Sequence, residues 1–469
     1  MLVLGLCLFA PVFALNNGVG RTPAMGWNSW NKFACDVNED LIKEHADALV
    51  ASGLADLGYN HINVDDCWQL TRDEKGFIHE DPSTFPSGIK ALSDYIHSKG
   101  LKFGLYSSAG TMTCQRRPGG LYYEQQDAQR YAEWEIDYFK YDNCFNDGLS
   151  DRAGNIRRYG ALRDALNATG RHINYALCQW GEQKIWEFGA DLGNSWRTTG
   201  DIEDKWESVI DIINKNLDLS KYAGPGGFND MDMLEVGNGH MTDEEYRTHF
   251  TVWAALKSPL LLGHDIRTMG QNTFDVIGNK EIIDINQDSL GKAAFFRARV
   301  ENVYLWVGEL SNGDRLLMVV NARENPVNAQ VSLSSLVSTK EERLLSASWE
   351  VYVRDLWLHE DIGLFSNVVP MRNIPAHGVR ILRLQRKGGD FPQLHPLVSH
   401  GKELIYVSEV SRSFCWSSVL SVVIFALLLP LLNRTFVFFK ASVIYFNTRD
   451  TEMIVLEDDE EERMLMKAE

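Results

Sequence analysis

Aspartate and tryptophan recur side by side where short apolar runs of this sequence end. Asp65 and Asp66 stand just before Trp68, and Asp142 closes the aromatic run that begins at Tyr138. Carboxylates can supply both a nucleophile and a proton donor, and aromatic rings can cover the apolar faces of sugars. The pairing of these two residue types favours a site that cleaves glycosidic bonds.

Individual carboxylates can be given provisional roles. Asp142 is a candidate nucleophile, because Lys140 lies two residues earlier on the same face of a strand and its charge would keep Asp142 ionised. A simple surface ion pair is the alternative. Asp201 opens a segment of helical period, so a helix N-cap is the alternative there. Asp65 and Asp66 place two like charges together, which suits acceptors for ligand hydroxyl groups.

Other chemistries lack their sequence signatures. The 12 histidines are scattered and no His-Glu-x-x-His motif occurs, so we expect no metal and no cofactor. The glycine-rich run 224–227 is typical of a tight turn rather than of a phosphate-binding loop. The 46 basic and 64 acidic residues give a formal charge of −18, which argues against nucleic acid as a partner.

The elements that must position these residues alternate in type from Thr22 to Asp288. Short apolar runs are separated by segments of helical period, such as 38–57 and 201–217, which predicts βα units and a parallel sheet. Eight such runs suggest a closed (β/α)8 barrel, in which chemistry takes place on the loops after the strands. The predicted strands are Ala24–Trp27, Tyr59–Val64, Leu101–Tyr106, Tyr138–Tyr141, His172–Leu177, Gly193–Trp196, Gly227–Asn229 and Pro259–Leu262.

The pattern changes after Gly291 to alternating strands without long helices, which predicts an antiparallel β domain. We therefore expect a catalytic domain over 15–290, a β domain over 291–386 and a linker over 387–413. Residues 414–433 contain a long uncharged stretch that could form a membrane span, although a soluble tail is the alternative. An acidic tail, 434–469, follows.

The N-terminal segment 1–14 is apolar and ends in small residues, as a secretory signal peptide does. A buried first strand is the alternative. Five cysteines remain between the signal and the late apolar segment, and an odd number suggests two disulfides and one free thiol in an oxidising compartment. Asn167 begins an Asn-Ala-Thr glycosylation triplet. We expect an extracellular, vacuolar or lysosome-like destination, or membrane anchoring with a lumenal catalytic domain.

Taken together, five segments between Asn17 and Arg386 resemble the α-galactosidases of glycoside hydrolase family 27, of the plant and fungal type. The resemblance implies a (β/α)8 barrel followed by an antiparallel β-sandwich. It also implies a retaining double displacement, with Asp142 as nucleophile and Asp201 as acid/base. The segments are Arg21–Trp30, Asp65–Trp68, Lys140–Cys144, Trp196–Ile202 and Gly224–Leu234.

The same matching implies which residues hold an α-galactoside. Asp65 and Asp66 would accept hydrogen bonds from the C4 and C6 hydroxyls, and Cys178 and Trp180 would lie near the C2 substituent, where Trp180 suits a hydroxyl rather than an N-acetyl group. The resemblance pairs Cys35 with Cys67 and Cys114 with Cys144, and leaves Cys178 free. The other positions that match the family's pocket are Trp30, Cys114, Lys140, Arg197, Asp232 and Met233.

Three positions depart from the family pattern: Ser108 replaces an aspartate, Met231 replaces a proline, and 121–123 replaces a glycine-containing loop. These departures bear on leaving-group preference and rate. The alternative functions are a β-L-arabinopyranosidase, an α-N-acetylgalactosaminidase or a catalytically silent sugar-binding protein. The sequence predicts no oligomeric state.

Overall fold

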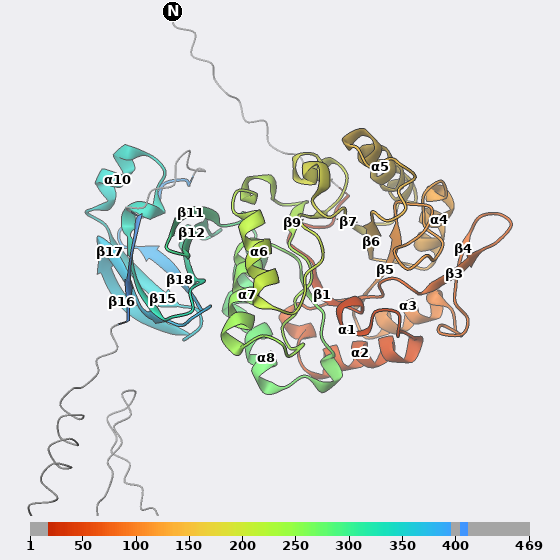
Figure 1. Ribbon diagram of the computed structural model, residues 1–469, viewed down its shortest axis with the longest axis horizontal. Helices are drawn as coiled ribbons and strands as arrows, with labels where there is room; N and C mark the ends of the chain where they lie inside the picture. Colours follow the sequence, from red (N-terminus) through yellow and green to blue (C-terminus); the bar gives the residue numbers. More distant parts are fainter. Residues whose placement is uncertain (1–16, 395–403, 411–469) are drawn as a thin grey trace, which may run out of the picture. The chain divides into compact units, whose positions relative to one another are not determined.

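The computed structural model describes residues 17–394 and 404–410 (Figure 1). The predicted signal peptide 1–14, the candidate membrane segment 414–433 and the acidic tail 434–469 lie outside these described residues. Within them, no helix is both long enough and apolar enough to cross a membrane.

Eight parallel strands form one sheet in the order β10-β1-β2-β5-β6-β7-β8-β9, which is the strand arrangement of a (β/α)8 barrel. All eight predicted strands are present, and no end lies more than two residues from its predicted position. The strands are β1 (Met25–Asn28), β2 (His61–Asn63), β5 (Lys102–Ser108), β6 (Tyr138–Asp142), β7 (Asn174–Cys178), β8 (Ser195–Arg197), β9 (Phe228–Asp230) and β10 (Leu260–Leu262).

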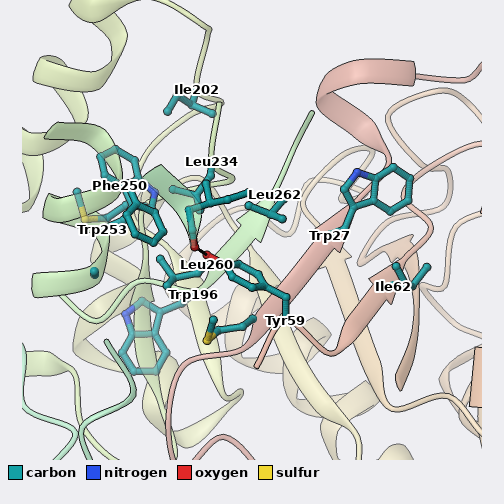
Figure 2. Close-up of a cluster of buried hydrophobic side chains, with 14 of the residues drawn as sticks. Trp27, Tyr59, Ile62, Trp196, Ile202, Leu234, Phe250, Trp253, Leu260 and Leu262 are labelled. Carbon is teal, nitrogen blue, oxygen red and sulfur yellow. Dashed lines mark hydrogen bonds between the residues drawn. The ribbon is translucent and has the colours of Figure 1, made fainter. Parts of the chain in front are cut away.

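The seam between β9 and β10 is closed by residues that follow β9. Leu234 forms a parallel bridge with Leu262. The Leu234 N–H donates to the Leu261 carbonyl at 2.8 Å, and the Gly263 N–H donates to the Leu234 carbonyl at 2.9 Å. Figure 2 shows Leu234 and Leu262 packed with Trp253 in the buried cluster beside this seam. The closure fixes the chain on both sides of Leu234, which includes candidate site residues.

Helices follow the barrel strands and bury their apolar faces on the sheet. The helix predicted over 38–57 begins at Glu39, and the Asn38 side chain caps it by accepting from the Leu41 N–H at 2.9 Å. The helices are α1 (Trp30–Phe33), α2 (Glu39–Ala51), α3 (Ile89–Ser98), α4 (Glu124–Glu133), α5 (Arg152–Ala168), α6 (Trp206–Asn216), α7 (Asp243–Ala255), α8 (Gln271–Ile277) and α9 (Lys280–Gln287); a hairpin, β3 (Gln69–Arg72) and β4 (Ile78–Glu80), extends from the loop after β2.

The helix predicted from Asp201 begins only at Trp206, with Lys205 as its N-cap residue. The preceding segment is held elsewhere, because the Ile202 N–H donates to the Asp232 carboxylate at 2.8 Å. Residues 201–204 are therefore a loop at the carboxyl end of the barrel. The N-cap interpretation of Asp201 is wrong.

Two antiparallel sheets enclose the second hydrophobic core, as the β-sandwich prediction requires. One sheet has the order β11-β12-β13-β18-β15-β16 and the other β17-β14-β19. The elements are β11 (Phe295–Val300), β12 (Val303–Glu309), β13 (Arg315–Asn321), β14 (Val327–Ser332), α10 (Lys340–Ser346), β15 (Glu350–Asp355), β16 (Glu360–Ser366), β17 (Val368–Ile374), β18 (Val379–Arg386) and β19 (Ile405–Glu409).

Strand β19 lies within the segment 387–413 that the sequence predicted as a linker. It pairs with β14 from Val331↔Ile405 to Val327↔Glu409, and Leu404 and Ile405 are buried in the sandwich core. The linker prediction is wrong for this stretch, because its apolar residues complete the smaller sheet. The β domain therefore extends beyond residue 386.

Candidate active site

A cavity of about 540 Å³ opens at the carboxyl ends of the barrel strands. Eleven of the twelve residues that the sequence assigned to catalysis or substrate binding line it. The twelfth, Cys178, is buried just behind the wall, with its Sγ 3.5 Å from Nη1 of Arg197. The eleven are Trp30, Asp65, Asp66, Cys114, Lys140, Asp142, Trp180, Arg197, Asp201, Asp232 and Met233.

Asp142 is the last residue of β6 and is only 6% exposed. The Tyr106 hydroxyl donates to its Oδ2 at 2.8 Å, and the Asn143 N–H donates to its Oδ1 at 2.8 Å. Burial raises the pKa of this carboxyl, and the Lys140 charge and the two hydrogen bonds offset the rise only in part. Each carboxylate oxygen of Asp142 therefore accepts a hydrogen bond, and the two bonds together fix the orientation of the side chain.

Lys140 does not pair with Asp142. Its ammonium donates to Oδ2 of Asp65 at 2.8 Å, and Asn28 Nδ2 donates to the same oxygen at 2.9 Å. The Lys140 charge still favours the ionised form of Asp142, as expected, but burial has the larger effect on the Asp142 pKa and raises it. The alternative of a surface ion pair is wrong, since the Asp65 side chain is 3% exposed and that of Lys140 is 14% exposed. Burial lowers the pKa of the ammonium, but the nearby carboxylates, Asp65 first, raise it well above its ordinary value.

Asp201 follows β8 and stands at the open side of the cavity, with a side chain that is 70% exposed. Nη2 of Arg197 lies 3.0 Å from its Oδ1. Desolvation would raise the pKa of this carboxyl, but the Arg197 guanidinium and the Lys140 ammonium together outweigh it and lower the pKa. The two candidate catalytic carboxyls therefore have pKa values displaced in opposite directions.

Arg197 also contacts Asp232, whose Oδ2 lies 2.9 Å from Nη2 of the guanidinium. The same carboxylate oxygen accepts the Ile202 N–H, so Asp232 connects the floor of the cavity to the loop that carries Asp201. Asp232 has a backbone φ of +79°, which is unusual for a residue other than glycine. Such a conformation persists only where surrounding contacts enforce it, and the Trp253 indole donates to the Asp232 carbonyl at 2.7 Å.

Asp66 is oriented by the loops that follow β2 and β5. Its Oδ1 accepts the Cys67 N–H at 2.7 Å, and its Oδ2 accepts the Gln115 N–H at 3.0 Å. Burial raises the pKa of Asp66, while these hydrogen bonds lower it. The carboxylate is therefore rigid and remains able to accept hydrogen bonds from a ligand, because each oxygen has further lone-pair capacity.

Two disulfides strengthen the same loops, with the pairing that the resemblance implied. Cys35 is bonded to Cys67, and Cys114 is bonded to Cys144, while Cys178 is free and buried. Sγ of Cys114 lies 3.3 Å from Oδ2 of Asp142, so this disulfide forms part of the wall beside the candidate nucleophile.

Sequence reasoning left ten of the lining residues of the cavity unassigned, including Tyr106 and Glu235. Tyr106 donates a side-chain hydrogen bond to Asp142, and its position at the end of a predicted strand was the only signal. Glu235 lies three residues after Asp232 and is 4% exposed. Its carboxylate accepts from Nδ2 of Asn31 at 2.5 Å and from Nδ2 of Asn238 at 2.6 Å. Burial raises the pKa of Glu235 to about 7.

Two groups of three potential metal ligands occur among the described residues. One consists of Cys114, Asp142 and Cys144, but both cysteines are used in the disulfide. The other, Asp94, His97 and Glu135, is on the surface, and Lys90 pairs with both of its carboxylates. Neither arrangement offers a site that would serve the cavity.

The cavity thus combines a buried, oriented carboxylate with a second carboxylate at its open side. Trp30 and Trp180 supply aromatic faces, and Asp65, Asp66 and Lys140 supply hydrogen-bonding groups. A nucleophile, a proton-transfer group and a polar cradle with aromatic walls are the elements of a retaining glycosidase.

Comparisons with known proteins agree with this geometry. Residues 22–288 match the family described as alpha galactosidase A, and residues 300–384 match the alpha galactosidase C-terminal beta sandwich domain. Alpha-galactosidase 3 of Arabidopsis thaliana is 52% identical over 353 residues, which cover 74% of this chain and 78% of that protein. Alpha-galactosidase of Cyamopsis tetragonoloba is 47% identical over 373 residues, which cover 79% and 87%.

Among solved structures, alpha-galactosidase I from Mortierella vinacea is 43% identical with a TM-score of 0.77, and the match covers 79% of this chain and 98% of that one. A GH27 β-L-arabinopyranosidase from Geobacillus stearothermophilus is 25% identical with a TM-score of 0.70, and the match covers 79% and 98%. The chain belongs to the alpha-galactosidase family of glycoside hydrolases, GH27.

Proposed function

We propose that this protein hydrolyses terminal α-D-galactosyl residues from oligosaccharides, galactomannans or glycolipids, with retention at the anomeric carbon. The observation that carries the proposal is that Asp142 and Asp201 line one cavity together with the residues expected to hold galactose. The identities with plant alpha-galactosidases, about 50%, support it.

In the first step, a carboxylate oxygen of Asp142 attacks C1 of the galactoside while Asp201 donates a proton to the departing oxygen. In the second step, Asp201 removes a proton from water, which attacks C1 and releases galactose from Asp142. In the free enzyme the protonated form of Asp201 is disfavoured, because Arg197 and Lys140 lower its pKa. A sugar that displaces water from Asp201 would raise that pKa by desolvation.

The selection of galactose is assigned to Asp65 and Asp66, which are fixed in place and face the cavity. Each would accept a hydrogen bond from a ring substituent, including the C4 hydroxyl whose configuration distinguishes galactose from glucose. A sugar lacking that match would leave buried polar groups unpaired, which is a strong penalty. Trp180 would exclude a bulky substituent at C2.

Trapping with a slow 2-fluoro galactosyl fluoride tests the mechanism. We expect mass spectrometry to find the fluorogalactosyl group on the peptide that carries Asp142, and proton NMR to show α-galactose as the first product. The Asp142→Asn variant, which keeps the shape of the side chain, should give no adduct. An adduct on another peptide, or β-galactose as the first product, would reject the assignment.

The substrate is tested by comparing nitrophenyl α-D-galactoside with nitrophenyl β-L-arabinopyranoside. The two sugars present the same ring hydroxyls, and only galactose carries the C6 group that Asp65 and Asp66 are proposed to recognise. We expect the galactoside to have the higher kcat/KM. A strong preference for the arabinopyranoside would reject the proposal.

We further propose that the protein enters the secretory pathway. Two disulfides are typical of oxidising compartments. Asn167 is exposed near the end of α5, so its side chain is accessible for glycosylation. A mobility shift on glycosidase treatment that is lost in Asn167→Gln would support this.

Extraction with alkaline carbonate tests anchoring by 414–433, since a true anchor stays in the membrane fraction.

A further inference from the structure

The cavity has room for more than the galactosyl ring. Its volume of about 540 Å³ lies within the range that encloses drug-sized ligands. Beyond the residues assigned to galactose, it is lined by side chains from the loops after β1, β8 and β9. We call this the outer part, and it consists of Asn31, Lys32, Ala34, Ile202, Glu203, Asp204, Glu235, Asn238 and His240.

The outer part is where the leaving group must lie. Asp201 is proposed to protonate the departing oxygen, so the group attached to that oxygen lies beside Asp201. Glu203 and Asp204 follow Asp201 by two and three residues in the chain, and both line the cavity. The leaving group therefore meets these two carboxylates as soon as it extends from the galactosyl ring.

The charges around the cavity are strongly unequal. Eight carboxyl groups line it, of which Glu235, with a pKa of about 7, is mostly uncharged at pH 6, whereas the lysine and arginine residues of the lining are Lys32, Lys140 and Arg197. Nζ of Lys205 lies 2.7 Å from Oε2 of Glu203, but both side chains are more than half exposed, so solvent weakens this pair and the Glu203 charge still acts at the opening of the cavity. Asp204 is fixed by the Tyr246 hydroxyl, which donates to its Oδ1 at 2.8 Å, and by the His240 N–H, which donates to its Oδ2 at 3.0 Å.

Because the proton leaves Asp201 during the first step, a further negative charge develops next to the leaving group in the transition state. We propose that the outer part of the cavity makes the enzyme selective for uncharged leaving groups, such as neutral sugars, and unfavourable for anionic ones, with Glu203 as a specificity-determining residue. This inference rests on the proposed α-galactosidase activity and specifies its substrate class.

Two disaccharide derivatives form a matched pair for the test. Galactosyl-α-(1→6)-glucitol and galactosyl-α-(1→6)-gluconate share the same leaving oxygen and the same open chain, and differ in a terminal CH₂OH or carboxylate. At pH 6 and low ionic strength we expect kcat/KM to be about 5- to 10-fold lower for the gluconate. The reason is repulsion between its carboxylate and the carboxylates of the outer part, which act as unit charges several ångströms apart in a medium of intermediate dielectric. In about 0.5 M NaCl the difference should shrink to within about 2-fold, because salt screens such interactions.

Variants then locate the charge that causes the difference. Glu203→Gln should raise the gluconate-to-glucitol ratio of kcat/KM by at least about 2-fold, and Lys32→Gln should lower it, since the two side chains have opposite charges. Glu207→Gln, on the exposed face of α6 and outside the cavity, should leave the ratio unchanged.

Equal kcat/KM values for the two compounds at low salt would overturn the inference, as would a difference that responds neither to salt nor to Glu203→Gln. Failure of the proposed function looks different, since neither compound would then be hydrolysed.

Discussion

Arg197 forms an ion pair with Asp201, with Nη2 of the guanidinium 3.0 Å from Oδ1 of the carboxylate. This contact lowers the pKa of the group that must donate a proton, while burial raises the pKa of Asp142, which must be ionised. In the free enzyme the form with Asp142 ionised and Asp201 protonated is therefore the minor one. In the pH profile of kcat/KM, the acid limb then follows Asp201 and the alkaline limb follows Asp142.

Replacing the guanidinium tests this order. Arg197→Gln removes the positive charge, so the pKa of Asp201 should rise and the acid limb of kcat/KM should move to higher pH by about 1 to 3 units. Arg197→Lys keeps the charge and should move the limb less. The measurement is kcat/KM for nitrophenyl α-galactoside as a function of pH. An acid limb that stays in place in Arg197→Gln would contradict the assignment.

The acid role of Asp201 predicts a dependence on the leaving group. Asp201→Ala should slow galactosides of poor leaving groups by about 10²- to 10⁴-fold, because their oxygen needs protonation in the transition state. Aryl galactosides with acidic phenols need little protonation and should be slowed less. Steady-state kinetics on a series of aryl galactosides measures this, and equal losses across the series would argue against an acid.

The location of the site was predictable from sequence because its signals are local. Apolar runs mark the barrel strands, and the residue that ends each run lies at the mouth of a barrel whatever the detailed packing. Asp142 at the end of β6 and Asp65 after β2 illustrate this. The predicted strand 193–196 likewise lies within two residues of β8 at both ends, and Arg197 is the last residue of that strand.

The pairing of charges was not predictable, because it depends on how loops far apart in sequence meet. Lys140 is two residues from Asp142 but pairs with Asp65, 75 residues away. Asp201 follows a motif that suits a helix N-cap, yet the Ile202 N–H bonds to Asp232 and delays the helix. Strand β19 has only five residues and completes a sheet through β14, so it carries too little pattern to be recognised alone.

The hydrogen bond from Tyr106 to Asp142 gives a prediction with a close control. Tyr106→Phe removes a donor that lowers the pKa of Asp142, so the alkaline limb of kcat/KM should move up by about one unit. Maximal kcat/KM should fall by about the same factor of ten, because the productive form becomes rarer.

Tyr141→Phe is the control for Tyr106→Phe. Tyr141 lies next to Asp142 on β6, is also buried, and its hydroxyl has no hydrogen-bond partner among the described residues. Loss of that hydroxyl should leave both limbs of the pH profile unchanged. If the two variants shift the alkaline limb equally, the hydrogen bond of Tyr106 is not what sets it.

Glu235 predicts a stability effect whose sign depends on pH. Burial raises its pKa from an ordinary value of 4.5 to about 7, so the folded state retains a proton that the unfolded chain has lost between these values. Wild-type stability should therefore fall as pH rises through this window, by up to about 3 kcal/mol from this group. Glu235→Gln cannot ionise, so its stability relative to wild type should be greater at pH 8 than at pH 5. Denaturant unfolding at the two pH values measures the difference, and a difference that does not change with pH would show that Glu235 ionises freely in the folded protein.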